Sequence, residues 1–128
     1  MKVLIADDDH FWVKILSAYL SSQGHEVSAV PTYKDALAAV YAGPPDCVIA
    51  DGALADMGAG DFCRLLRSDR RFDHTAVVEV SGAEPGEDHG TDAFILKEGD
   101  IEKIERVACA AARARSLRGG PRCKPPEK

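Results

Sequence analysis

Short runs of apolar residues alternate along the chain with segments whose apolar positions repeat at helical spacing. Five of the runs have the length and composition of β-strands and lie at residues 2–6, 26–30, 47–50, 76–80 and 93–96. Helical spacing occurs at residues 11–22, 33–42, 61–68 and 101–111. Strands that alternate with helices are typical of a parallel sheet whose two faces are both covered by helices. The sequence therefore predicts a doubly wound α/β fold with five parallel strands.

The predicted helices have recognisable ends. Asp9 precedes the first helix as an N-cap, and Thr32, followed three residues later by Asp35, precedes the second. Asp100 can cap the last helix, and Gly24 is placed to end the first one as a C-cap. These signals are independent of the apolar spacing and support the same helices.

Length and composition are those of one globular domain. The chain has 128 residues, of which 45% are hydrophobic and 29% charged, and this is enough to build a single core. Residues 118–128 are rich in glycine, proline and charge and carry no apolar pattern. We expect one domain over residues 1–117 and a flexible tail over residues 118–128.

Charge, hydropathy and cysteine content narrow the class of protein. The net charge is −5 and the pI about 5.3, which disfavours direct contact with nucleic acid. No apolar stretch approaches the ~20 residues that span a bilayer, and the first apolar run turns acidic at Asp7, unlike a signal peptide. None of the four cysteines forms a C-x-x-C pair; Cys47, Cys63 and Cys109 lie in apolar segments and are expected to be buried, while Cys123 lies in the tail. We expect a cytoplasmic protein with reduced thiols and no membrane insertion.

Polar residues follow four of the predicted strands at their carboxyl ends. They are Asp7-Asp8, Asp51, Ser81 and Lys97. In a doubly wound fold these ends meet at one edge of the sheet, where ligands bind. Two carboxylates roughly 4 Å apart repel by about 4 kcal/mol at an effective dielectric constant of ~20, so the cluster needs a proton or a cation. Oxygen-only ligands favour Mg²⁺, and an aspartate beside this ion can accept a phosphoryl group.

Four stretches of the sequence resemble the receiver domains of bacterial two-component response regulators. They are KVLIADDD at residues 2–9, PDCVIAD at residues 45–51, VSG at residues 80–82 and DAFILK at residues 92–97. Together, in this order, they make a resemblance that covers about residues 1–115. It implies a flavodoxin-like sheet with the strand order 2-1-3-4-5.

The resemblance also implies how the acidic site works. Asp51 matches the phosphoacceptor, and Asp7, Asp8, Asp51 and the main-chain carbonyl of Ala53 match the ligands of Mg²⁺. The phosphoryl group would come from a histidine kinase or a histidine phosphotransfer protein. The only reactions expected are self-phosphorylation from a phosphodonor and slow autodephosphorylation, so the protein is not expected to be an enzyme in the usual sense.

Three further residues match positions that respond to the phosphoryl group. Lys97 matches the lysine that pairs with the acceptor carboxylate and then with phosphoryl oxygens. Ser81 matches the hydroxyl switch, and Phe94 matches the aromatic switch that turns inward when Ser81 moves. Phosphorylation adds up to ~2 negative charges and biases a two-state equilibrium, which an unknown downstream protein would read.

Two segments near the end of the predicted sheet depart from the family pattern. Lys97 is followed by Glu98-Gly99, where the family usually has proline. The segment between Ser81 and Lys97 is shorter than usual by roughly six residues, and residues 82–91 contain helix breakers. The fourth helix of the family, between the fourth and fifth strands, is therefore expected to be short or absent. This helix belongs to the usual dimer face, so we expect a monomer or a weak, non-standard dimer.

The loop after Asp51 is a third departure. It lacks the family's proline and contains Gly52, Gly58 and Gly60, which predicts an unusually free loop. The departures favour an alternative function, a pseudo-receiver that acts as a phosphorylation-independent interaction domain. The intact set of acidic residues opposes this alternative.

Several weaker alternatives remain open. A phosphohydrolase with an aspartyl nucleophile is disfavoured because Asp51 lacks a second aspartate two residues later. His10 could join the acids in a transition-metal site, although a surface position at the start of a helix is favoured. The other three histidines, His25, His74 and His89, are expected in solvent. A basic cluster near the third helix is expected to be solvated or to contact an acidic partner, and it comprises Arg64, Arg67, Arg70 and Arg71.

Overall fold

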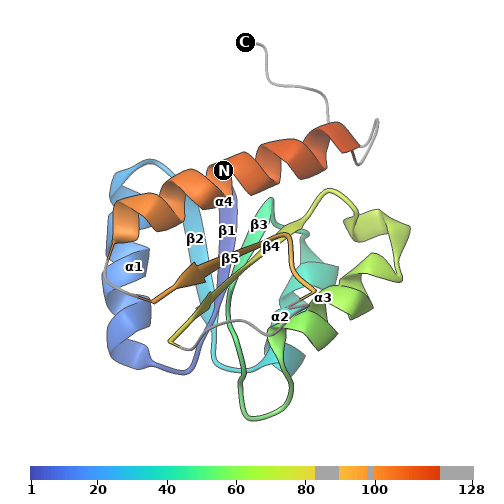
Figure 1. The fold of residues 1–128 in the computed structure, drawn as a ribbon, viewed down its shortest axis with the longest axis horizontal. Helices are drawn as coiled ribbons and strands as arrows, with labels where there is room; N and C mark the ends of the chain where they lie inside the picture. The colour runs from blue at the N-terminus through green and yellow to red at the C-terminus, as the bar shows by residue number, and fades with distance from the viewer. Residues whose placement is uncertain (83–89, 98–99, 119–128) are drawn as a thin grey trace.

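The computed structural model describes residues 1–82, 90–97 and 100–118 (Figure 1). Five parallel strands form one sheet in the order β2-β1-β3-β4-β5. The strands are β1 (Lys2–Ala6), β2 (Glu26–Val30), β3 (Cys47–Asp51), β4 (Ala76–Ser81) and β5 (Ala93–Leu96). The helices are α1 (His10–Ser22), α2 (Tyr33–Ala42), α3 (Ala59–Arg67) and α4 (Ile101–Arg118), with a 3₁₀ turn η1 (Arg70–Phe72). The predicted fold and strand order are confirmed.

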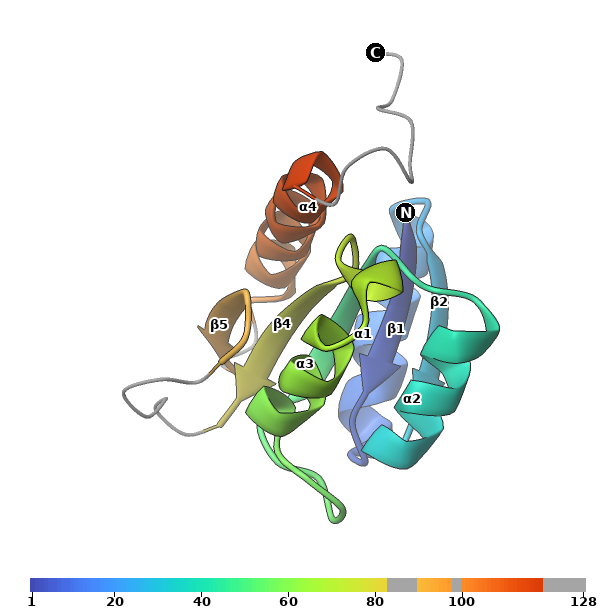
Figure 2. The ribbon, with the colours of Figure 1, turned by 90° about the vertical axis from the view of Figure 1, so that its right-hand side faces the viewer.

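Helices cover both faces of the sheet and divide the core in two (Figure 2). Leu4 and Ala6 of β1 pack with residues of α2 and α3 on one face. Val3 and Ile5, the alternate residues of the same strand, pack with residues of α1 and α4 on the other face. Because both faces are buried, the central strands β1 and β3 are nearly continuous apolar runs and not alternating ones. Most polar side chains of the central strands are thereby placed at the strand ends.

The register of the strands aligns these ends. Ala6 pairs with Ala50, so Asp7 and Asp51 leave the sheet side by side. One strand further, Asp51 itself pairs with Val80, the residue before Ser81. Ser81 pairs in turn with Leu96, the residue before Lys97. All the strand-end residues singled out in the sequence therefore lie along one edge.

Most predicted helix signals operate as expected. The carboxylate of Asp9 accepts a hydrogen bond from the main-chain N–H of Trp12 (3.1 Å), and Asp100 accepts one from Lys103 (3.0 Å). Thr32 caps α2 through the N–H of Asp35 at 3.1 Å. Within the described ranges, no helix is both long enough and apolar enough to cross a bilayer.

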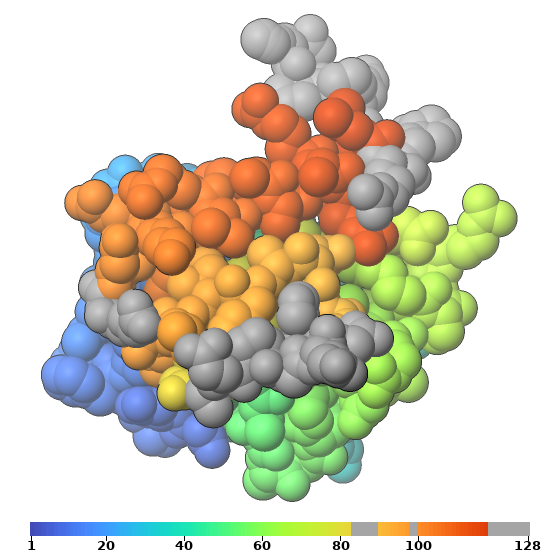
Figure 3. All heavy atoms as spheres, in the orientation of Figure 1, coloured from blue at the N-terminus to red at the C-terminus, as the bar shows by residue number. Residues whose placement is uncertain are grey.

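Helix α4 extends further than its apolar stripe, which ends near Ala111. It continues to Arg118, because Arg115 on its last turns forms an ion pair with Asp92 instead of facing solvent alone. Figure 3 shows α4 lying alongside β5 on one surface of the molecule. The expected tail begins at the final residue of this helix, and the boundary between residues 117 and 118 stays a prediction. The short or absent helix after β4 falls on residues 83–89, outside the described residues.

Asp92 joins three elements at the end of the sheet opposite the acidic residues. Its Oδ2 accepts hydrogen bonds from the guanidinium of Arg67 and the main-chain N–H of Val77, both at 2.8 Å. Its Oδ1 accepts two from Arg115, at 2.8 and 3.0 Å. Burial raises the pKa of Asp92, but the Val77 N–H and the two arginines outweigh it and hold the pKa below its usual value. This carboxylate therefore ties α3, β4 and α4 together.

The basic cluster predicted near α3 is mostly paired with acids. Only Arg70 has no ion pair among those described here. The ion pairs of the other three are Arg64–Asp61, Arg67–Asp92 and Arg71–Asp69. Three of the four arginines are thus paired with acids of this chain, and the structure gives no support to a basic surface for an acidic partner.

Asp92→Asn should lower the free energy of unfolding by about 3 kcal/mol at neutral pH, because it leaves two largely buried guanidinium groups without a counter-charge. Urea unfolding measures this change. Asp69→Asn is the matched control, because its partner Arg71 is 68% exposed and solvent screens this pair, so the loss should be much smaller than for Asp92→Asn. Equal losses in the two variants would contradict the assigned role of Asp92.

The same carboxylate should give a pH dependence. The pKa of Asp92 is lower in the folded chain than in the unfolded chain, where it is ~3.9, so its contribution is fully present above that pH. The contribution is lost as the pH falls through the folded-state pKa. The stabilities of the wild type and Asp92→Asn should therefore begin to converge as the pH falls below about 4. A constant difference down to about pH 2 would refute this explanation.

Candidate functional site

Three carboxylates meet at the carboxyl edge of the sheet. Asp7 and Asp8 directly follow β1, and Asp51 ends β3. One carboxylate oxygen of each lies within 4.8 Å of those of the other two. Asp7 is buried, Asp51 is half-buried and Asp8 is exposed, so the cluster opens to solvent on one side. The structure thus brings together the three acids that the sequence placed at this edge.

The cluster carries excess negative charge. Burial raises the pKa of Asp51, and the charges of Asp7 and Asp8 raise it further. The ammonium of Lys97 and the main-chain N–H of Gly52 lower the pKa of Asp51, but they do not offset the rise. A site that holds only oxygen donors and too much negative charge suits a hard divalent cation such as Mg²⁺. The donor set therefore fits the ion that was predicted.

Lys97 is fixed beside the acids by three contacts. Its Nζ donates a hydrogen bond to Oδ2 of Asp7 at 3.0 Å and lies 5.3 Å from the ring centroid of Trp12. Its main-chain N–H donates to the carbonyl of Ser81 at 2.7 Å. The sequence predicts that this lysine pairs with Asp51, but its ion pair in the structure is with Asp7. The ammonium still lies within electrostatic reach of Asp51, since it lowers the pKa of that carboxyl.

The loop after Asp51 is held by main-chain hydrogen bonds, which corrects the expectation of an unusually free loop. Ala53 forms a bridge with Gly58, and the N–H of Leu54 donates to the carbonyl of Met57 at 2.9 Å. The N–H of Ala59 donates to the carbonyl of Gly52 at 2.9 Å. A closed turn of this kind fixes Ala53, whose carbonyl remains a predicted Mg²⁺ ligand.

Two residues that sequence reasoning missed connect the loop to α2. Asp56 accepts hydrogen bonds from the main-chain N–H groups of Tyr33 and Lys34, at 3.1 and 2.8 Å. The hydroxyl of Tyr33 donates to the main-chain carbonyl of Asp51. Burial raises the pKa of Tyr33, and the charges of Asp51 and Glu79 add to this rise, so the phenol stays protonated and remains a donor. No local sequence pattern marks either contact, because both join segments far apart in the chain.

Gly52 lies in a tight space between the acceptor and the end of β4. A Cβ added at this position would lie 2.8 Å from Oγ of Ser81, 3.0 Å from its Cβ and 2.9 Å from Oε2 of Glu79. Glu79 is a buried acid inside an otherwise apolar strand. Close approach of Ser81 to the residue after Asp51 therefore depends on a glycine here.

The remaining predicted residues occupy positions compatible with their expected roles. Ser81 ends β4, and Phe94 lies half-buried on β5, where it pairs with Glu79. Their roles as switches stay predictions. His10 is exposed at the start of α1, and among the described residues the ligating group at this edge consists of the three aspartates without it. The transition-metal alternative at this edge thus gains no support.

Histidines and cysteines elsewhere differ from expectation in three cases. His74 is buried and His25 is half-buried, although both were expected in solvent. Cys47 and Cys63 are buried free thiols as expected, whereas Cys109 is exposed. The apolar spacing of α4 misplaced Cys109 because this residue lies at the margin of the buried stripe, next to Ala108.

Gly52→Ala should destabilise the fold by about 1–3 kcal/mol, because the new methyl group overlaps Ser81 at a position where the backbone cannot easily move. Urea unfolding gives this value. Gly58→Ala is the matched control from the same loop, since its added Cβ meets only the Gly52 carbonyl oxygen at an ordinary 3.5 Å. If both variants lose the same stability, the close packing of Gly52 is not what constrains the loop.

Comparison with characterised proteins finds regulators that are similar over most of this chain, and TcrA and MtrA are two examples. The transcriptional regulatory protein TcrA of Mycobacterium tuberculosis is 28% identical over 98% of this chain and 49% of its own length. The DNA-binding response regulator MtrA of Mycobacterium leprae is 31% identical over 89% of this chain and 51% of its own length. The chain thus spans about half the length of these relatives.

Solved structures share the fold. A sensor protein from Polaromonas sp. JS666 superposes with a TM-score of 0.78 at 23% identity, covering 89% of this chain and 97% of that one. The response regulator TrrA from Thermotoga maritima, solved in complex with Mg²⁺–BeF, superposes with a TM-score of 0.77 at 15% identity, covering 86% and 97%. Residues 3–108 match the family model of the response regulator receiver domain. The acids at the sheet edge, the strand order and this match agree, and the chain belongs to the receiver domain family of response regulators.

Proposed function

We propose that this chain is the phosphoacceptor module of a two-component or phosphorelay system and that Asp51 accepts the phosphoryl group in a Mg²⁺-dependent reaction. The observation that carries the proposal is the meeting of Asp7, Asp8 and Asp51 within 4.8 Å, with the ammonium of Lys97 beside them. The donor would be a phosphohistidine on a histidine kinase or a histidine phosphotransfer protein.

The reacting groups have distinct tasks. Asp7, Asp8, Asp51 and the carbonyl of Ala53 would hold Mg²⁺, which when bound offsets the charge between the carboxylates and the incoming phosphoryl group. An oxygen of Asp51 attacks phosphorus as the bond from phosphorus to the donor's histidine nitrogen breaks, and that nitrogen keeps the electron pair. The half-buried position of Asp51 leaves one side open to the donor. Because the pKa of Asp51 is raised, a positive charge nearby would stabilise the ionised carboxylate that attacks phosphorus.

The phosphoryl group would then engage the ends of β4 and β5. Lys97 can exchange its Asp7 partner for a phosphoryl oxygen, and Ser81 Oγ already lies against Gly52, next to the acceptor. The two residues are joined through the Lys97 N–H and the Ser81 carbonyl at 2.7 Å, so a movement of one displaces the other. Phe94, on β5, is the proposed reporter of that movement.

Partners and location follow from the same proposal. TcrA is named a transcriptional regulatory protein and MtrA a DNA-binding response regulator, but this chain spans only about half of each. With a net charge of −5, the domain is proposed to act in the cytoplasm through proteins and not by touching DNA itself. The pseudo-receiver alternative gains no support, because every predicted reacting residue is present at the edge of the sheet.

Phosphoryl incorporation from phosphoramidate with Mg²⁺, followed by intact-mass spectrometry, tests the proposal. Asp51→Asn should abolish incorporation, and Asp8→Asn should slow it at least roughly tenfold through loss of an ion ligand. Asp9→Asn is the matched control from the same acidic run. Asparagine can still cap α1, and the hydrogen bond to Asp7 comes from the main-chain N–H of residue 9, so the rate should be kept. Incorporation that persists in Asp51→Asn, or an equal loss in the Asp8 and Asp9 variants, would overturn the assignment.

A further inference from the structure

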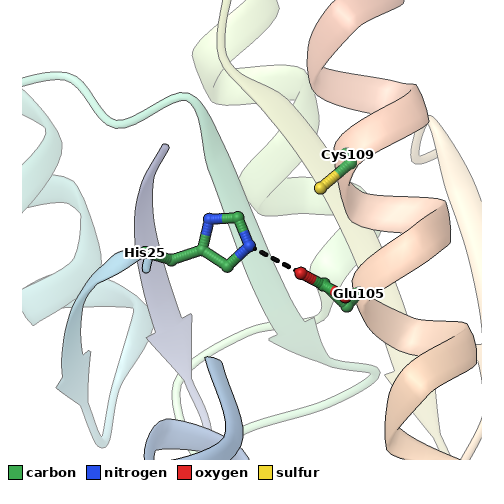
Figure 4. Close-up of side chains that lie close together, drawn as sticks. All are labelled: His25, Glu105 and Cys109. Atoms are coloured by element: carbon green, nitrogen blue, oxygen red, sulfur yellow. Dashed lines mark hydrogen bonds and ion pairs between the residues drawn. The ribbon is translucent and has the colours of Figure 1, made fainter. Parts of the chain in front are cut away.

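A second group of ligating side chains lies where the strands begin, at the edge opposite the phosphoacceptor site. His25 directly precedes β2, and Glu105 and Cys109 lie one turn apart on α4. Figure 4 shows the three side chains directed into one space between the start of β2 and the helix. A ring nitrogen, a carboxylate oxygen and the sulfur all lie within 4.8 Å of one another.

The histidine and the glutamate are already oriented toward each other. Nε2 of His25 lies 2.8 Å from Oε2 of Glu105, and Nδ1 lies 3.0 Å from the amino nitrogen of Met1. The hydroxyl of Tyr19 donates to Oε1 of Glu105 at 3.5 Å. The contact between Nδ1 of His25 and Met1 orients the ring so that its Nε2 faces Glu105. The contact between Oε1 of Glu105 and Tyr19 leaves the other carboxylate oxygen, Oε2, to face the ring. Outer contacts of this kind orient the ligands of metal sites.

Two simpler explanations account for less of the geometry. An ion pair that ties α4 to β2 needs His25 and Glu105 but gives no part to Cys109. A cysteine nucleophile needs a ring nitrogen directed at sulfur, yet Nε2 contacts Glu105 and Nδ1 contacts Met1.

We propose that His25, Glu105 and Cys109 form a binding site for Zn²⁺. Nitrogen, oxygen and sulfur are the three donor types that this ion accepts together, and three protein ligands leave its fourth tetrahedral position to water. Bonds of 2.0–2.3 Å place tetrahedral ligand atoms roughly 3.3–3.7 Å apart. His25 and Glu105, now 2.8 Å apart, would separate slightly, and the sulfur, which lies within 4.8 Å of both, would approach by at most about 1.3 Å.

Binding exchanges protons for the metal. The Cys109 thiol proton and the proton between Nε2 and Glu105 pass to solvent, while Nδ1 takes the proton that it shares with the amino nitrogen of Met1. The bound ion would join the start of β2 to the middle of α4. Because this place is separate from the aspartates, the proposal is independent of phosphorylation at Asp51.

Cobalt and zinc binding to the full chain tests the site, with Cys123→Ser in every protein to remove the thiol outside the described residues. Co²⁺ should give a thiolate-to-metal absorption band at one ion per chain, and Zn²⁺ should displace it. Cys109→Ser should remove the band, and Cys109→Ser and His25→Gln should each weaken Zn²⁺ binding at least about tenfold in competition with a chromophoric chelator. Zinc should also raise the thermal unfolding midpoint of the parent protein and not that of Cys109→Ser.

His10→Gln is the matched histidine control, because His10 lies next to the aspartates, and it should leave zinc binding unchanged. Phosphoryl incorporation should also be unchanged in Cys109→Ser, which shows that the variant is folded; Cys109→Ala serves as a second variant. A band that survives Cys109→Ser, a loss of zinc affinity in His10→Gln, one ion shared between two chains, or no binding at all would overturn the proposal.

Discussion

Parallel pairing of β1, β3, β4 and β5 forces like charges together, and the chemistry of the molecule depends on this constraint. Because the central strands are buried on both faces, their polar side chains lie mostly at the strand ends, and the register aligns those ends along one edge. Asp7 and Asp51 are neighbours because Ala6 and Ala50 are paired. The repulsion between them is offset only in part by Lys97. A bound cation would therefore stabilise this site and would also offset the charge of an incoming phosphoryl group.

The two ends of the sheet treat buried carboxylates in opposite ways. Asp92 is matched by two guanidinium groups and a main-chain N–H, so its pKa falls and its charge supports the fold. Asp51 is partly buried and lies next to other acids, so its pKa rises and its charge opposes the fold until a ligand binds. The contacts of Asp92 hold β4 and α4 together. The acidic cluster of Asp7, Asp8 and Asp51 at the other end of the sheet has unbalanced charge and can respond to ligands.

Sequence reasoning succeeded wherever the feature depends on periodicity or on strand ends. Apolar runs gave the five strands, and the residues directly after them gave the acidic edge, because the topology of a doubly wound sheet allows no other place for them. Sequence reasoning failed where a side chain has two candidate partners from distant parts of the chain. Lys97 lies near both Asp7 and Asp51, and its ion pair with Asp7 goes together with its contact with Trp12, which no sequence pattern predicts.

Other omissions have the same origin. Glycines suggested a free loop after Asp51, but main-chain hydrogen bonds close it, and these depend on the path of the backbone and not on residue type. Helix α4 continues beyond its apolar stripe, where Arg115 forms an ion pair with Asp92, a residue far away in the sequence. His25 meets Glu105 for a similar reason, since the start of β2 and the last helix come together only in the folded chain.

The central claim is that Asp7, Asp8 and Asp51 share one hard divalent cation. Mn²⁺ takes the same oxygen ligands as Mg²⁺ and broadens NMR signals of nearby nuclei, so a titration of the uniformly labelled chain locates the ion directly. We expect the main-chain amides of Asp8, Asp51 and Gly52 to broaden first, Mg²⁺ to restore them, and the amides around Arg115, at the opposite end of the sheet, to stay sharp. Broadening centred on any other part of the chain, or none at these amides, would contradict it.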